Sequence, residues 1–332
     1  MKRPFFRIFP TLSIILFCFL FLAMINSLHA ENQVLGNTQL KLLISWDLND
    51  PEEIILKAKD KDWKFFPQSF AEKDGLIWFV NRYEPLLVKY PLKGPFQPDF
   101  IPLQHSKDKK FSARFFIDLL FDKKDIFCLE QSTASLRKTD ETGVINDMFL
   151  ITEAQGAIIS HTWKSGDNEF GFFDEGLHKV YFRKFGPKTN DAPDKAGSEL
   201  MIEEPKIIPG SKGILCIRNP QENCTQVIFQ PKIDNGGTIK AANYESAEVI
   251  PLDVGEKDCF YLYVSKADSA FISVLKMNDS GKGFSEKRYS VEKMLFPKKA
   301  AQICRVLKAD KLLLLTTTGK KISLQGCTLT EK

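Results

Sequence analysis

The stretch that decides the fold is PQSFAEKDGLIWFVNRYEPLLVKYPLKG, residues 67–94. A charged segment with Asp74 and Gly75 precedes the apolar run LIWFV, and a polar segment separates this run from a second one, PLLVKY. The pattern is typical of β-strands joined by turns. The stretch is therefore either a single hairpin or one copy of a repeat.

A comparison of the sequence with itself favours the repeat. A shift of 49 residues aligns residues 69–94 with residues 118–143 without a gap, and four positions are identical: Ile77, Leu87, Lys89 and Gly94 of the first copy. The apolar pattern around them also matches. Internal similarity at a spacing of about 20–50 residues is typical of repeat folds, including propellers.

Short apolar runs of the same character recur along the chain. We call the residue just before each run its anchor. Four consecutive apolar residues indicate a strand that is buried on both faces, because a half-exposed strand would alternate. A ring of small antiparallel sheets packed face to face provides such burial. We therefore predict an all-β fold, a six-bladed β-propeller. The anchors, spaced by 49, 54, 34, 45 and 53 residues, are Leu76, Asp125, Lys179, Gly213, Asp258 and Lys311.

The spacing of 34 residues is short for a blade and contains a polar stretch, residues 187–206, that is typical of an exposed loop. Either that blade is shortened or one anchor is misplaced. The alternative folds are a seven-bladed ring with a degenerate unit and two β-sandwich domains joined near residues 190–205.

The segment QLKLLISWDL, residues 39–48, predicts a strand without a hairpin partner nearby. Because propellers often close their ring with a strand from the other terminus, we assign it to the C-terminal blade. Residues 31–332 are then expected to form a single propeller domain.

Residues 69–94 resemble a blade of the NHL-type six-bladed propellers. The charged Asp-Gly turn, the apolar strand, its polar end and a second strand ending near Gly94 follow that family's layout. The family's usual Asp at the strand end is Asn81 here and Glu130 in the next copy. The resemblance implies a propeller fold and says little about function.

Residues 1–30 have the pattern of a secretory signal peptide. Lys2, Arg3 and Arg7 precede an apolar run over residues 11–25, and a polar segment ends at Ala30. We expect cleavage after Ala30; because Leu28 is larger than the usual small residue, an uncleaved anchor is the alternative. Either outcome places the rest of the chain outside the cytoplasm, in the periplasm or secreted.

Without residues 1–30 the chain carries 43 Lys and Arg against 42 Asp and Glu. A nearly neutral chain has no electrostatic preference for nucleic acid or an anionic membrane. We expect no nucleic-acid partner, and membrane contact only through an uncleaved N-terminal segment. The expected partner is a protein, peptide or small ligand of the cell envelope.

The position that follows each apolar run is polar in all six units, and we call these residues the polar column. If the units are blades, the column rings one face, and five of its members could bind a ligand through hydrogen bonds. The other interpretation is structural, with the same side chains capping turns or pairing across blades. The five predicted ligand-binding residues are Asn81, Glu130, Lys184, Arg218 and Tyr263, and Thr316 completes the column.

A binding or scaffolding protein of the cell envelope is the main functional prediction. The alternative is a hydrolase or lyase, because resemblance to the propeller lactonases and lyases would imply a metal near the axis. Asn81 and Glu130 are the only column members of suitable type, which is too few ligands. We therefore predict no cofactor, no metal site and no catalytic residue, and we interpret the acidic residues 47–53 as a solvated turn.

Six cysteines follow the signal segment. Cys216 and Cys224 flank a turn-rich segment between two apolar strands, and we predict a disulfide between them. Cys304 and Cys327 are poor partners, because the strand from Lys311 should lie between them. The remaining two cysteines, Cys128 and Cys259, belong to apolar runs of different units and are expected to be buried thiols.

Overall fold

The computed structural model describes residues 36–48, 55–58, 61–81, 84–94, 97–105, 116–152, 154–166, 169–184, 199–201, 206–221, 223–232, 237–298, 300 and 302–331. The predicted signal peptide, residues 1–30, lies outside the described residues, as does most of the acidic segment 47–53 and of the polar stretch 187–206. Among the described residues, strands dominate, and the one helix is the short 3-10 turn η1 (Glu256–Asp258).

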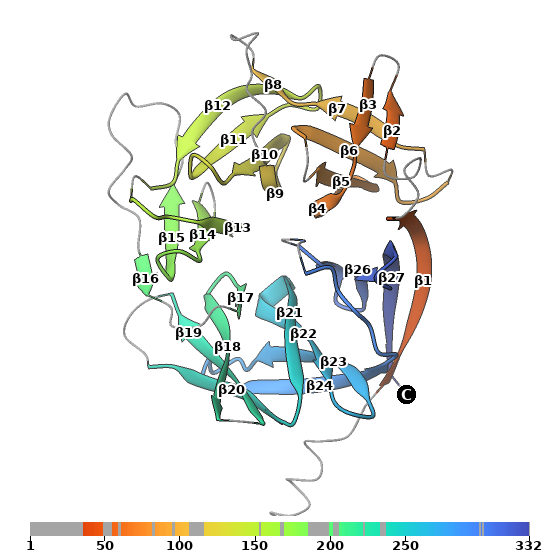
Figure 1. Ribbon diagram of the computed structural model, residues 1–332. Helices are drawn as coiled ribbons and strands as arrows, with labels where there is room; N and C mark the ends of the chain where they lie inside the picture. Colours follow the sequence, from red (N-terminus) through yellow and green to blue (C-terminus); the bar gives the residue numbers. More distant parts are fainter. Residues whose placement is uncertain are drawn as a thin grey trace, which may run out of the picture.

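The described strands form four-stranded units arranged in a ring (Figure 1). Within a unit, strands that follow one another in sequence pair antiparallel. The first three units are β4 (Pro67–Lys73), β5 (Leu76–Asn81), β6 (Leu86–Pro91) and β7 (Asp99–Pro102); β9 (Phe116–Asp122), β10 (Asp125–Glu130), β11 (Ser135–Thr139) and β12 (Val144–Leu150); and β13 (Ile159–Gly166), β14 (Glu169–Asp174), β15 (Lys179–Lys184) and β16 (Glu199–Met201).

The next two units have the same order. They are β17 (Lys206–Pro209), β18 (Gly213–Gln221), β19 (Cys224–Pro231) and β20 (Ile239–Glu245); and β21 (Glu248–Gly255), β22 (Cys259–Ser265), β23 (Ala270–Met277) and β24 (Phe284–Val291). Two short additions lie outside this scheme: β8 (Gln104–His105), which pairs parallel with β12, and the hairpin of β2 (Ile55–Ala58) and β3 (Lys61–Lys64).

The sixth unit closes the ring with strands from both ends of the chain. It consists of β25 (Cys304–Lys308), β26 (Lys311–Thr317), β27 (Lys321–Glu331) and β1 (Gly36–Asp47). β1 pairs antiparallel with β27 along its whole length and adds a short parallel contact with β24. The predictions of an all-β propeller and of closure by an N-terminal strand are confirmed, and the two-sandwich alternative is wrong.

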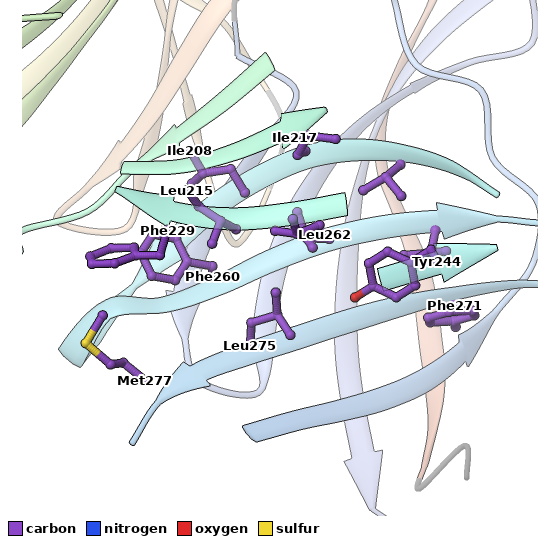
Figure 2. Packing of buried hydrophobic residues seen from close by; sticks show 13 residues of the cluster. Ile208, Leu215, Ile217, Phe229, Tyr244, Phe260, Leu262, Phe271, Leu275 and Met277 are labelled. Atoms are coloured by element: carbon purple, nitrogen blue, oxygen red, sulfur yellow. The ribbon is translucent and has the colours of Figure 1, made fainter. Parts of the chain in front are cut away.

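The core lies between neighbouring sheets, because the second strand of each unit is apolar on both faces. In β22, Phe260 and Leu262 pack with the preceding unit, whereas Tyr261 and Tyr263 pack with the sixth unit. Figure 2 shows the first of these layers, in which side chains such as Leu215 from β18 face those of β22 and β23. This two-sided burial is what the apolar runs predict.

The irregular spacing around the third unit arises from a misplaced anchor. The run after Lys179 forms β15, which is the third strand of its unit, and the second strand is β14. With Glu169 in place of Lys179, the neighbouring spacings become 44 and 44 residues instead of 54 and 34. The blade is therefore not shortened. The sequence did not predict β14 as a second strand, because Gly171 interrupts its apolar run, EFGFFD.

Candidate functional site

The ring encloses a central cavity of about 890 Å³. Residues of the first strand of every unit line it, namely β4, β9, β13, β17, β21 and β25, together with the segment before β25 (Figure 1). These strands are sheet edges, since the described pairing joins each of them only to the second strand of its unit. Backbone groups of an edge strand are available for other contacts, and Pro209 and Pro251 reduce the donors on β17 and β21.

Asp118 of β9 joins the first three units from inside the ring. Its Oδ1 accepts hydrogen bonds from Ser69 Oγ at 2.5 Å and from the Leu119 N–H at 2.9 Å. Its Oδ2 accepts the Thr162 N–H of β13 at 2.9 Å. Because the side chain is only 1% exposed, these bonds replace the water that a carboxylate would otherwise require.

Arg305 of β25 reaches from the sixth unit to the same carboxylate. Its Nη2 lies 4.0 Å from Asp118 Oδ1, and its Nη1 lies 3.9 Å from Asp253 Oδ1 of β21. The Nε donates to the Phe70 carbonyl at 2.7 Å, which fixes the guanidinium beside the first unit. One cation therefore links strands on opposite sides of the ring.

Asp253 of β21 is a carboxylate of the cavity wall whose side chain is only 13% exposed. Burial raises the pKa of Asp253, and the attraction of Arg305 opposes this shift only in part. Its Oδ2 accepts the Val306 N–H at 2.8 Å. Arg305 and Asp253 thus place a donor and an acceptor side by side on the wall, a combination suited to amide, hydroxyl or carboxylate groups of a ligand.

Most of the remaining wall is apolar, including Phe121, Ile250 and Leu252. Trp163 also lines the cavity, and its ring lies so close to Gly171 that a Cβ there would collide with it. Among the described residues, the buried Nε1 of Trp163 has no hydrogen-bond partner. The wall therefore combines a majority of apolar residues with polar and charged ones, among them Lys164, Glu248 and Lys298, and small-molecule sites are likewise lined mostly by apolar side chains together with polar groups.

The five predicted ligand-binding residues lie in five different units and not on the wall of the central cavity. Asn81 and Glu130 are fully buried. Asn81 Oδ1 accepts the Phe66 N–H at 2.8 Å, and Glu130 forms an ion pair with Arg137 at 2.7 Å. The contact of Glu130 lies within its own unit, and that of Asn81 is made with the residue just before β4.

The other three members have different surroundings. Tyr263 is buried, and its hydroxyl accepts the Met294 N–H at 2.8 Å. Lys184 is exposed at the end of β15, on the third strand of its unit. Arg218 is half-buried, with its Nε directed to Gln226 Oε1 at 3.3 Å, and it lines a second cavity. Ligand binding by the column stays a prediction.

The position that corresponds to Asn81 and Glu130 in the third unit is Asp174, the last residue of β14. It is fully buried, and its Oδ1 accepts the Ile158 N–H at 2.8 Å and the Gly176 N–H at 3.0 Å. Asp174 thus caps a turn, as the structural interpretation of the column expects. Lys184 entered the column only through the misplaced anchor.

The predicted Cys216–Cys224 disulfide is wrong, because both thiols are free. The strands β18 and β19 continue further than expected, so that Cys216 lies opposite Ile228 and Cys224 lies opposite Gln221. Gln221 is five residues beyond Cys216 on the same strand, about 16 Å away at the usual rise per residue. The two sulfur atoms therefore cannot meet.

The remaining four cysteines are free as well. Cys128 is buried, as expected, and burial raises the pKa of its thiol. Cys259 is only half-buried, so this part of the prediction is wrong. β26 separates Cys304 on β25 from Cys327 on β27, as the sequence predicts.

Across the described ranges, no three His, Cys, Asp or Glu side chains gather in a way that could hold a metal ion. Among the same residues, no helix has the length and hydrophobicity needed to cross a membrane. The expectation that the protein needs no cofactor stays a prediction.

Comparison with solved structures identifies propellers of similar shape at low sequence identity. The PQQ-bound form of aldose sugar dehydrogenase from Streptomyces coelicolor has a TM-score of 0.52 and 10% identity, and the match covers 89% of this chain and 99% of that one. A puromycin-hydrolysing peptidase from Mycobacterium tuberculosis has a TM-score of 0.50 and 12% identity, with 78% and 44% covered.

A catalytically inactive virginiamycin B lyase from Staphylococcus aureus, with quinupristin, has a TM-score of 0.49 and 10% identity, with 89% and 100% covered. No protein-family model and no curated protein matches the chain. At these identities the similarity extends to the propeller fold alone.

Proposed function

We propose that this protein is an extracytoplasmic binding protein of the cell envelope whose ligand, a small molecule or a short peptide, occupies the central cavity. The wall of that cavity carries the proposal. It places the Arg305 and Asp253 side chains in a mostly apolar space of about 890 Å³. Cavities of about 300–1,000 Å³ with few polar groups are typical of small-molecule sites.

The location rests on residues 1–30, which have the pattern of a secretory signal. The NHL-type assignment is likewise part of the proposal and rests on the blade pattern of residues 69–94. Mass spectrometry of the protein from the extracytoplasmic fraction tests the location. An N-terminus at Glu31 is expected, and recovery of the intact chain from the cytoplasm would contradict it.

The second candidate is a hydrolase or lyase that acts in the same cavity. It is supported by the similarity in fold to a puromycin-hydrolysing peptidase. Metal analysis of the purified protein separates the two candidates. A stoichiometric bound metal would favour the lactonase-like enzyme with an axial metal.

Ligand capture by a cavity-filled variant tests the main proposal. Ile250 is half-buried and lines the cavity, so Ile250→Trp should fill part of it. The parent protein and the surface control Lys240→Gln should retain the same compounds from envelope extracts, identified by mass spectrometry after denaturation. Ile250→Trp should lose them while it melts like the parent. Equal capture by Ile250→Trp would show that the ligand binds elsewhere.

A further inference from the structure

A second cavity of about 570 Å³ lies beside the central one, between the β18–β19 hairpin and the start of β21. Eight of the twelve described residues that line it are polar, among them Arg218, Asn219 and Thr225. Lys206 and Glu248 line both cavities, so the two spaces adjoin. A ligand could therefore extend from the central cavity into its neighbour.

The charges of the second cavity favour an anion. Lys206 and Arg218 are its two cations, and in the part of the chain that the structure describes neither forms a salt bridge with a carboxylate. Among the described residues of the same wall, Glu248 is the single carboxylate, so that the described cations outnumber the described carboxylates. Gln226 Oε1 accepts from Arg218 Nε, which helps to orient the guanidinium.

We propose that the second cavity is a carboxylate subsite, and that the ligand has an apolar body in the central cavity and a carboxylate beside Lys206 and Arg218. This inference rests on the proposed function, since the body of the ligand is assigned to the central cavity. A guanidinium binds a carboxylate through paired hydrogen bonds, and a nearby ammonium adds a second charge. A long-chain fatty acid and a short apolar peptide with a free C-terminus both have this chemistry.

Two matched pairs of probes test the subsite on residues 31–332. The first pair is a dansyl-labelled undecanoate and its methyl ester, and the second is an apolar tetrapeptide with a free C-terminus and its amide. The acid of at least one pair should bind about tenfold more tightly than its neutral partner, as expected for charge-assisted hydrogen bonds. The pair that shows the preference identifies the source of the carboxylate. The preference should weaken as salt is added.

Variants of the wall locate the effect. Arg218→Gln and Lys206→Gln should each reduce the preference for the acid, and the double variant should remove it without changing the affinity for the neutral probe. Arg218→Lys should retain part of the preference because it keeps the charge. Glu248→Gln should increase it, because the competing carboxylate is lost. Lys240→Gln, on the outer strand β20, is the matched control and should behave like the parent.

The outcomes separate this inference from the proposed function. Equal affinity for acid and neutral probes, with both excluded by Ile250→Trp, would overturn the carboxylate subsite and leave the central ligand site intact. A preference for the acid that survives in the double variant would also overturn the subsite. Failure of all four probes to bind would overturn the subsite and, together with unchanged capture by Ile250→Trp, the proposed function.

Discussion

The two sides of the central cavity use one repeat position for different purposes. Ser69, Asp118 and Lys206 each lie opposite the fifth residue of the second strand in their unit. On the side of β4, β9 and β13, which we call the latched side, Ser69 and Asp118 bond to each other and Arg305 approaches them. On the side of β17 and β21, the open side, Lys206 lines both cavities.

The difference shows which part of a blade is free to vary. The second strands pack on both faces on either side of the ring, as Trp78 and Phe260 illustrate. The first strands face the cavity with one edge, so that their polar residues can either join neighbouring units or remain available to a ligand. Ligand binding in this ring is therefore expected mainly on the open side, where Asp253 meets Arg305, and rigidity mainly on the latched side.

Removal of β1 is the most severe test, because neither side exists without a closed ring. Deletion of residues 36–47 should leave β27 as an unpaired edge and should abolish cooperative thermal unfolding, measured by circular dichroism. A chain that begins at residue 31 is the control. A deletion variant that melts like this control would show that the ring does not depend on closure.

Truncation of the core should affect both sides equally. Trp78→Ala on the latched side and Phe260→Ala on the open side should each lower the free energy of unfolding by about 3–5 kcal/mol, through lost burial and a cavity. Urea denaturation measures both. A much smaller loss for Phe260→Ala would mean that the open side differs in its core as well as at the cavity.

Asp118→Ala tests the contacts of Asp118 with Ser69 and Thr162, which we call the latch. The change leaves Ser69 and the Thr162 N–H without their acceptor inside the ring and should lower the free energy of unfolding by about 1–3 kcal/mol. Ser69→Ala removes one of these bonds and should cost less. If Asp118→Ala unfolds at the parent's urea midpoint, the latch contributes nothing to stability.

Asp253→Asn should change the pH dependence of stability. Burial raises the folded-state pKa of Asp253 above its ordinary value of 3.8, so the folded protein holds this proton more tightly than the unfolded chain. The stabilising contribution is complete below about pH 3.8 and is lost as the pH rises through the raised pKa. Relative to the parent, the variant should become more stable from about pH 4 to pH 7. Parallel urea curves at all pH values would contradict this.

Lys206→Gln should have the smallest effect on stability. Lys206 is exposed at the start of β17, and a surface change of this kind alters the free energy of unfolding by less than about 0.5 kcal/mol. The contrast with Asp118→Ala, at the same repeat position, sharpens the distinction between the two sides. A loss as large as that of Asp118→Ala would make the open side a second latch.

The apolar runs made the fold predictable, because strands buried on both faces produce a strong signal. Five of the six runs are second strands, and the exception followed from Gly171, which removes a side chain where Trp163 needs the space. The disulfide could not be judged in the same way. Strand length decides which residues of a hairpin face each other, and the turn between Gln221 and Cys224 is shorter than the sequence indicates.

The site was harder to predict than the fold. The polar column was sought at the ends of second strands, whereas the cavity is lined by first strands, whose mixed composition gives no clear pattern. One signal was present in the 49-residue alignment, which places Ser69 on Asp118. Two polar residues at one position of otherwise apolar strands suggest a contact, but only the ring geometry brings them to 2.5 Å. Arg305 is far away in the sequence, and no sequence pattern predicts its contact with Asp118.

The closure strand also determines the order in which the molecule can be completed. Among the described strands, β1 is synthesised first and its partner β27 last, so the pairing of Gly36 with Glu331 must wait until residue 331 has been made. Contacts between such distant residues form slowly, and until then β1 and β27 expose strand edges that can pair with other chains. The first of the described strands to leave the ribosome is therefore the last of them to dock, and the interval between these two events is when a newly made chain is most prone to aggregate.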